Sequence, residues 1–151
     1  MTENNKIEKS FGPVGSFAGI LIFVAGMILS FFYFSALILV VIGAFVGFSS
    51  SSTLIDYEKK RVRFSNNLFG IIKIGKWLNI EQSMKIGIKS SNVTWRSYSQ
   101  GNRTLDVENK DYRIMLFDAG NKEILPIKKI NSKDLAKIEL ETIGNRLGLS
   151  F

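Results

Sequence analysis

One uninterrupted apolar stretch decides the fold of this protein: SFGPVGSFAGILIFVAGMILSFFYFSALILVVIGAFVGFSSSSTLI, residues 10–55. It contains no charged side chain and consists mostly of Ile, Leu, Val, Phe, Ala and Gly. A single helix of this length would be roughly 70 Å long, more than twice the ~30 Å hydrocarbon core of a bilayer. Two passes of about 18 residues fit better. The sequence therefore predicts a transmembrane helical hairpin over residues 13–50, with helices at about 13–31 and 34–50.

Charged residues at the two ends of this stretch predict its orientation. Lys6 and Lys9 precede the first helix and a basic run at 59–63 follows the second, whereas the aromatic turn at 31–34 carries no charge. The positive-inside rule then places both termini in the cytoplasm. A cleaved signal peptide fits less well, because the stretch is too long and no small-residue cleavage site follows the first span. We expect a multi-pass protein of the cytoplasmic (inner) membrane, with residues 1–12 as a cytoplasmic tail.

Each predicted helix carries two glycines four residues apart. This spacing gives a flat strip on one helix face, where another backbone can approach closely. We expect the strips to pack the two helices together, with homo-oligomer formation as the second interpretation. Neither helix contains an ionisable group, which argues against an ion or proton pathway through the hairpin. The glycines are Gly15, Gly19, Gly43 and Gly47.

Composition narrows the chemistry of the rest of the chain. Lys and Arg number 20 against 13 Asp and Glu, a formal charge of +7, and the excess lies after residue 50. A basic domain next to an apolar block suggests anionic phospholipid headgroups nearby, although nucleic acid would also fit the charge. The sequence has no Cys and no His. Disulfides, thiolate nucleophiles, the usual zinc sites and His acid–base chemistry are therefore excluded, and no metal or cofactor is expected.

From residue 52 the pattern changes to short β segments separated by turn signals. Residues 118–121, Asp-Ala-Gly-Asn, and residues 100–102, Gln-Gly-Asn, are the clearest turns. At 112–117 the alternation of apolar and polar residues fails, which predicts a strand buried on both faces. The predicted segments are 53–57, 61–64, 68–74, 76–80, 85–88, 93–98, 103–107, 112–117 and 123–127.

An amphipathic helix is predicted to close the chain. Ser132 is a plausible N-cap and Asp134 suits the first turn. Leu135 and Ile138 lie off the apolar face and are free to touch the domain edge, the hairpin or a partner. The apolar face consists of Ala136, Leu140, Ile143 and Leu147.

Residues 54–64, Gly75-Lys76-Trp77 and the helix starting at Ser132 together resemble bacterial pleckstrin-homology-like (PH-like) domains. The resemblance covers about residues 52–148. It implies an α+β membrane protein: the two-helix hairpin followed by an antiparallel β sandwich or barrel of about seven strands with a C-terminal α-helix. In lipid-binding members of the family, a basic cluster on the first hairpin holds the phosphorylated headgroup.

The basic run of this chain matches that position. The resemblance therefore implies an anionic-lipid contact, and the alternatives are non-specific attraction to the membrane or plain solvation of charges that only set orientation. The residues concerned are Lys59, Lys60, Arg61 and Arg63.

Catalytic and nucleic-acid sites find less support. Asp106 and Glu108, two apart, could act as an acid–base pair but fit an ordinary surface strand better. Trp77, Trp95 and Tyr98 do not form a basic-aromatic stripe long enough for nucleic acid. No phosphate-binding Gly loop or Ser triad is present. No catalytic residue is predicted.

We therefore expect a non-catalytic, membrane-anchored binding or scaffold module. Its PH-like domain, residues 52–151, would lie at the cytoplasmic membrane surface and bind a protein partner or anionic lipid. The alternative is an accessory subunit of a membrane transport or secretion complex, in which the glycine-containing helices dock against other helices. An enzyme acting on lipid or envelope material ranks third, because the catalytic inventory is so small.

Overall fold

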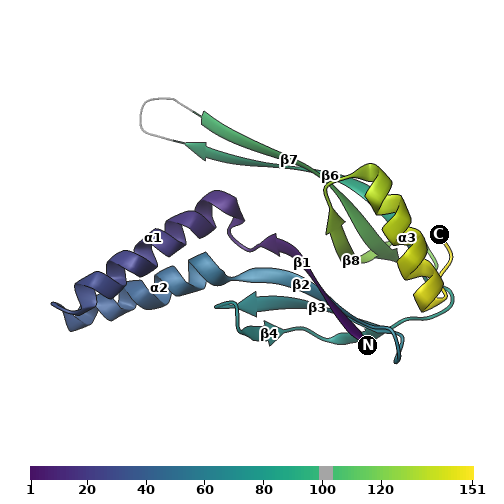
Figure 1. Cartoon of the computed structure of the whole chain (residues 1–151), viewed down its shortest axis with the longest axis horizontal. Helices are drawn as coiled ribbons and strands as arrows, with labels where there is room; N and C mark the ends of the chain where they lie inside the picture. Colours follow the sequence, from purple (N-terminus) through teal and green to yellow (C-terminus); the bar gives the residue numbers. More distant parts are fainter. Residues whose placement is uncertain (99–103) are drawn as a thin grey trace.

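In a computed structural model the protein is α+β, as predicted, and the structure describes residues 1–98 and 104–151 (Figure 1). It describes no side chains for residues 93–109. The described residues form three α-helices and eight strands in two antiparallel sheets. The elements are β1 (Thr2–Lys9), α1 (Gly12–Ser30), the 3₁₀ helix η1 (Phe34–Ala36), α2 (Leu37–Phe48), β2 (Ser50–Asp56), β3 (Arg61–Leu68), β4 (Ile72–Ile74), β5 (Trp77–Asn79), β6 (Lys85–Tyr98), β7 (Thr104–Phe117), β8 (Glu123–Ile130) and α3 (Lys133–Leu147).

The first sheet has the order β1-β2-β3-β4, and β5 also pairs with β3. Helices α1 and α2 interrupt it, because they lie in sequence between the antiparallel neighbours β1 and β2. Lys9 lies opposite Ser50 at the point where the strands meet the helices. The prediction of a cytoplasmic tail at 1–12 is therefore wrong for residues 2–9, which form an edge strand. In this polar segment only Asn5 and Ile7 are buried, so its pairing with β2 rests mainly on backbone hydrogen bonds. The segment therefore has almost no apolar pattern from which a strand could be predicted.

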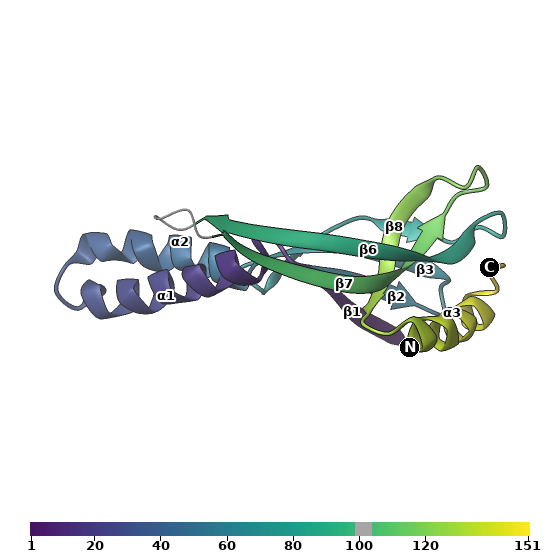
Figure 2. The ribbon, with the colours of Figure 1, turned by 90° about the horizontal axis from the view of Figure 1, so that it is seen from above.

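The helices α1 and α2 lie side by side and extend from the end of the first sheet, while the long strands β6 and β7 run in the same direction beside α1 (Figures 1 and 2). The 19 residues of α1 make it about 28 Å long, and among the described residues it is the one helix long and apolar enough to cross a membrane. The second predicted helix, 34–50, is shorter in the structure. It comprises the 3 residues of η1 and the 12 of α2, about 24 Å together. It stops at Phe48 because Ser49 is extended and β2 begins at Ser50.

The second sheet has the order β6-β7-β8. The segments predicted at 85–88 and 93–98 are one 14-residue strand, and those at 103–107 and 112–117 are another. The turn predicted at 100–102 lies outside the described residues. Ile114, Met115 and Leu116 are buried in succession, which confirms a strand covered on both faces. The predicted turn at 118–121 is confirmed, since the Asp118 N–H donates to the Lys122 carbonyl at 2.9 Å.

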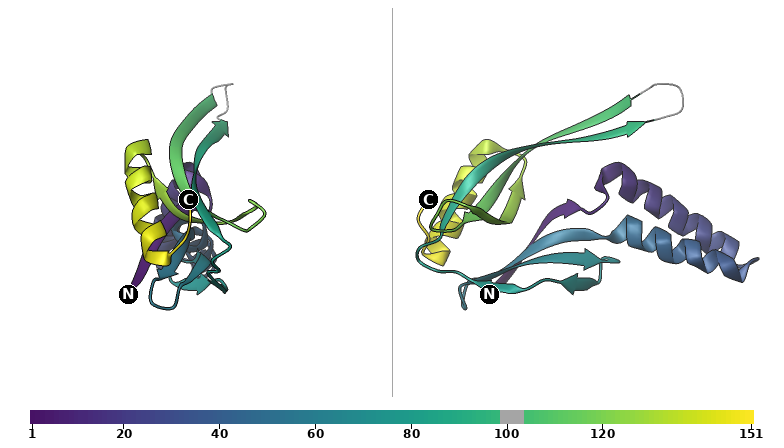
Figure 3. Two further views of the ribbon diagram at one scale, coloured as in Figure 1. Left: turned by 90° about the vertical axis from the view of Figure 1, so that its right-hand side faces the viewer. Right: turned by 180° about the vertical axis from the view of Figure 1, so that it is seen from behind.

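The two sheets do not close into a barrel, and α3 contacts all three strands of the second sheet (Figure 3). The helix begins after Ser132 as predicted and ends at Leu147, and the C-cap Gly148 has a left-handed backbone (φ 72°) that suits glycine. Both chain termini lie at the end of the molecule away from α1 and α2 (Figure 1). The core between sheets and helix consists of Ile55, Val62, Met84, Ile86, Ile114, Leu116, Leu125, Ile127, Ile143, Leu147 and Leu149.

Candidate functional site at the junction of helices and sheet

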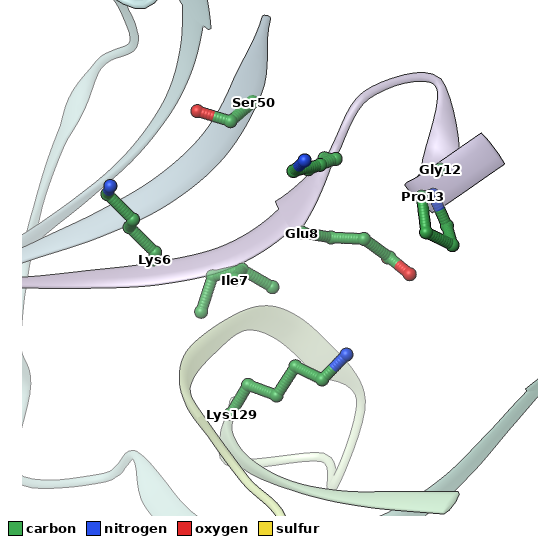
Figure 4. Close-up of a pocket in the computed structure, with 8 residues that line it drawn as sticks. Lys6, Ile7, Glu8, Gly12, Pro13, Ser50 and Lys129 are labelled. Carbon is green, nitrogen blue, oxygen red and sulfur yellow. The ribbon is translucent and has the colours of Figure 1, made fainter. Parts of the chain in front are cut away.

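The junction is the region where β1 enters α1 and where α2 enters β2. It contains a cavity of about 290 Å³ (Figure 4). Gly12, with φ 69°, lets the chain turn from the strand into the helix, and Pro13 occupies the first helical turn. The cavity is lined by Lys6, Ile7, Glu8, Lys9, Gly12, Pro13, Ser50 and Lys129.

A β-bulge sets which way the lysines of β1 point. Lys6 lies opposite Ser52, and Lys9 lies opposite Ser50, because Ile7 is an extra residue in the register. Residues two apart on β2 share a face, so Lys6 and Lys9 also share one despite being three apart. In Figure 4, Lys6 points away from Lys129, on the other side of β1.

The negative charges near the cavity are already balanced. Arg113 donates to Asp111 Oδ2 at 2.8 Å and to Glu8 Oε2 at 3.3 Å, and Lys129 Nζ lies 3.7 Å from the same Asp111 oxygen. Burial alone would lower the pKa of Arg113, but the Asp111 and Glu8 carboxylates raise it overall. Within the described part of the chain Lys6 forms no ion pair, and neither does Lys9. Two exposed, uncompensated cations therefore lie beside the start of α1.

The basic run at the β2–β3 turn lies elsewhere. Ser50 pairs with Asn67 next to the helices, whereas Asp56 pairs with Arg61 at the opposite end of β2, about 20 Å away for seven residues. Lys59 and Lys60 therefore lie beyond the end of β2 that is farther from the apolar helices. The physical reason is that β2 leads directly away from α2.

The two arginines of that run make contacts within the domain. Arg61 Nε donates to Asp56 Oδ2 at 3.1 Å, and its guanidinium lies 4.2 Å from the centre of the Trp77 ring. The Arg63 guanidinium lies 4.9 Å from the centre of that ring. Cation–π contacts of this kind stabilise the ring and both charges together. Of the four basic residues, Lys59 and Lys60 are the two that are exposed to solvent at this turn.

Three of the four predicted packing glycines lie between α1 and α2. A Cβ at Gly19 would overlap the backbone of Gly47, and a Cβ at Gly43 would overlap the backbone of Phe23. Gly15 does not take part, since a Cβ there would meet only Phe11, at 3.0 Å. Gly26 was missed: a Cβ on it would lie 2.8 Å from the Val40 nitrogen. Its spacing of seven from Gly19 places both on one helix face and could have indicated it.

A polar cluster fastens the start of β1 to the rest of the domain. The Tyr57 hydroxyl donates to Glu3 Oε2 at 2.7 Å, and Lys128 Nζ bonds Glu3 Oε1 at 3.1 Å and Glu139 at 2.9 Å. Burial raises the pKa of Tyr57, and the neighbouring Glu3 carboxylate raises it further. Burial would also raise the pKa of Glu3, but the hydrogen bonds from Tyr57 and Lys128 hold it below its usual value. Sequence reasoning missed this cluster, since Glu3 looked like part of a tail.

The described residues offer no group of three or more carboxylates that could hold a metal ion. Asp106 and Glu108, considered as an acid–base pair, lie in the segment whose side chains the structure does not describe. No protein-family model matches the chain, and no curated protein or solved structure is significantly similar to it. Function must therefore be inferred from the geometry of the helical pair and its junction.

Proposed function

We propose that this protein is a non-catalytic binding module that α1 and α2 anchor in a membrane as a two-pass hairpin. The sheet domain is held at the surface of the bilayer, next to the junction. There it binds anionic lipid headgroups or a protein partner.

The observation that carries this proposal is the outward-facing apolar surface of the helical pair. Residues buried in α1 are Gly12, Ser16, Gly19 and Gly26, so its large side chains point outward. Phe17, Leu21 and Ile28 are more than half exposed, as are Ile38 and Val41 of α2. A water-soluble protein rarely exposes an apolar surface of this extent, whereas a bilayer covers it favourably.

The pairing of β1 with β2 supports two passes. β1 leads into α1 and β2 leads out of α2, and the Ser10 N–H donates to the Ser49 carbonyl at 3.1 Å. If α1 alone crossed the bilayer, its two flanking strands would lie on opposite sides and could not pair. The shorter α2 reaches the hydrocarbon thickness with modest local thinning of the bilayer. Lys6 and Lys9 at the junction, against an uncharged aromatic turn, favour a cytoplasmic sheet domain.

A PH-like relationship remains part of the proposal. Antiparallel strands followed by a C-terminal helix that covers the core support it. The chain differs from the expected PH-like barrel in two features: its sheets stay open, and the strand β1 is added.

An accessory role in a transport or secretion complex receives less support. Gly19, Gly26, Gly43 and Gly47 are already used between α1 and α2, which leaves only Gly15 of the predicted strip for another helix.

The two-pass anchor is tested by the accessibility of single cysteines, since the natural chain has none. In intact cells, a membrane-impermeant maleimide should label Phe32→Cys in the helical turn but label Lys122→Cys in the β7–β8 turn only after permeabilisation. The chain should also stay with membranes in alkaline carbonate. Labelling of both positions from one side, or release by carbonate, would contradict the proposal.

The lipid contact is tested with two matched double variants of the full chain. Attraction to anionic lipid is about 1 kcal/mol per basic residue at the surface and falls off within a Debye length of about 8–10 Å. Lys6→Glu with Lys9→Glu should therefore reduce the phosphatidylglycerol retained in native mass spectrometry. Lys59→Glu with Lys60→Glu, about 20 Å away along β2, should reduce it less. The reverse order would mean that the β2–β3 turn lies on the membrane.

A further inference from the structure

The turn between β3 and β4 exposes a cluster of isoleucines. Ile71 is 80% exposed, Ile72 53% and Ile74 56%. All three residues of β4 are exposed, and among the described residues β4 pairs only with β3, from Leu68 opposite Ile72 to Asn66 opposite Ile74. An exposed apolar sheet edge in water invites association with other chains. We therefore expect an apolar partner or environment to cover these side chains.

Contacts with the end of α2 fix where this turn lies. The Phe69 N–H donates to Ser49 Oγ at 3.3 Å, and the Phe69 ring meets the Phe45 ring edge-on with 5.5 Å between centroids. A Cβ on Gly70 would lie 3.4 Å from the Phe48 carbonyl oxygen. Phe69 itself adopts φ 54°, a backbone conformation that a bulky residue rarely takes and that surrounding contacts must hold. The turn is thus held against the helix end.

The exposed surface of the turn continues that of the helical pair. Phe48, the last residue of α2, is 42% exposed and lies directly beside Gly70. Phe69 bridges to Phe45 one turn further into the helix. Figure 1 shows the β3–β4 turn next to the end of α2 that joins the sheet. The apolar surface therefore runs from the helices onto Ile71 and Ile72.

Two lysines lie among and after the isoleucines: Lys73 lies between Ile72 and Ile74 in β4, and Lys76 follows Ile74. Lys73 and Lys76 are exposed, and neither forms an ion pair among the residues that the structure describes. Isoleucines at a tip with lysines beside them match the boundary of a bilayer, with acyl chains below and anionic headgroups above.

We propose that the β3–β4 turn, residues 69–74, inserts Ile71, Ile72 and Ile74 into the headgroup–acyl boundary of the bilayer that holds α1 and α2. This inference rests on the proposed membrane anchor. It adds a third attachment point off the axis of the helical pair. Three points that are not in line fix the tilt of the first sheet on the membrane surface.

The test places one environment-sensitive fluorophore on the full chain in vesicles of phosphatidylcholine and phosphatidylglycerol. It is attached to cysteine in Ile71→Cys, and separately in Asn79→Cys, which is exposed on β5 at the same sheet edge but far from α2. Lipids carrying a nitroxide near the headgroup should quench the label at position 71 several-fold more than the label at 79. The matched position 79 controls for a dye that inserts by its own affinity.

Val41→Cys, on the outward face of α2, separates this inference from the anchor. Quenching at position 41 by nitroxides deep in the acyl chains, without quenching at 71, would overturn the insertion of the turn and leave the anchor standing. Absence of quenching at 41 would overturn both. A second test needs no fluorophore and uses the double variant Ile71→Asp with Ile72→Asp. In vesicles, the backbone amides of residues 69–74 should exchange hydrogen faster in this variant than in the natural chain. Unchanged exchange would also contradict the proposal.

Discussion

The helices α1 and α3 bury opposite kinds of residue. The face that α1 turns toward the protein is made of glycine and serine, and its large apolar side chains point outward. The face that α3 turns inward carries Ala136, Ile143 and Leu147, and its outer face carries most of its charges. α3 is held by the hydrophobic effect, which acts because the outer face of the helix is in water while its apolar face is removed from water. α1 is held by close backbone contact with α2. Helices pack in this way in apolar surroundings such as the bilayer that we propose for α1.

The largest effect is expected where a substitution removes apolar volume from the buried face of α3. Ile143 is buried in the core, so Ile143→Ala should lower the free energy of unfolding of the sheet domain by about 3–4 kcal/mol through lost burial and a cavity. Urea unfolding of the detergent-solubilised chain, followed by tryptophan fluorescence, measures it. The matched control Ile138→Ala, on the exposed side of α3, should change it by less than about 0.5 kcal/mol. Equal losses would show that the outer face of α3 is also covered.

Adding volume should have the larger effect on the α1–α2 half. A Cβ at Gly43 overlaps the backbone of Phe23, so Gly43→Ala should weaken the helical pair by about 2 kcal/mol. Spin labels on Leu21→Cys and Val41→Cys should report a longer and broader distance between the helices. Val24→Leu, which adds volume on the outward face, should leave that distance unchanged. A distance that does not respond to Gly43→Ala would remove the role assigned to this contact.

The smallest effect is expected where the edge strand meets the domain. The folded pKa of Glu3 lies below its ordinary value of 4.5, so its ionised form stabilises the fold above that pH. This contribution is lost as the pH falls through the lowered pKa. Glu3→Gln should therefore cost about 1 kcal/mol at neutral pH and almost nothing in strong acid.

The free energy of unfolding of Glu3→Gln and of the natural chain, measured at neutral pH and in strong acid, gives the cost of the substitution at each pH. Glu141→Gln, at an exposed carboxylate on α3, is the matched control and should change the free energy of unfolding by less than about 0.5 kcal/mol at neutral pH. A pH-independent cost at Glu3 would mean that shape, rather than charge, holds β1 in place.

Much of the fold could be predicted because apolar periodicity is local. The α+β class, the C-terminal helix from Ser132 and the β7–β8 turn all follow from residues adjacent in sequence. β1 could not be predicted this way, since its partner β2 is separated from it by the whole helical pair. For each of the long strands β6 and β7 the sequence predicts two short segments, because the polar residues in the middle of the strand resemble turn signals.

The candidate site was less predictable for a related reason. The basic run at 59–63 is prominent in sequence, but sequence distance from the apolar helices does not give distance in space. A strand of seven residues carries it about 20 Å away, whereas Phe69 and Ile71, further along the chain, return to α2 along β3. Only the register of β2 with β3 shows which of the two turns faces the helices.

The position of α1 and α2 between β1 and β2 has a consequence for biosynthesis. Under the proposed two-pass anchor, β1 leaves the ribosome before both helices and must wait without its neighbour until they have been inserted and β2 has followed. The sheet can be completed only if the two strands emerge on the same side of the bilayer. A chain in which one helix failed to insert would keep β1 and β2 apart and leave the domain unfinished. In the proposed anchor, completion of the first sheet would thus depend on the correct topology of the helices.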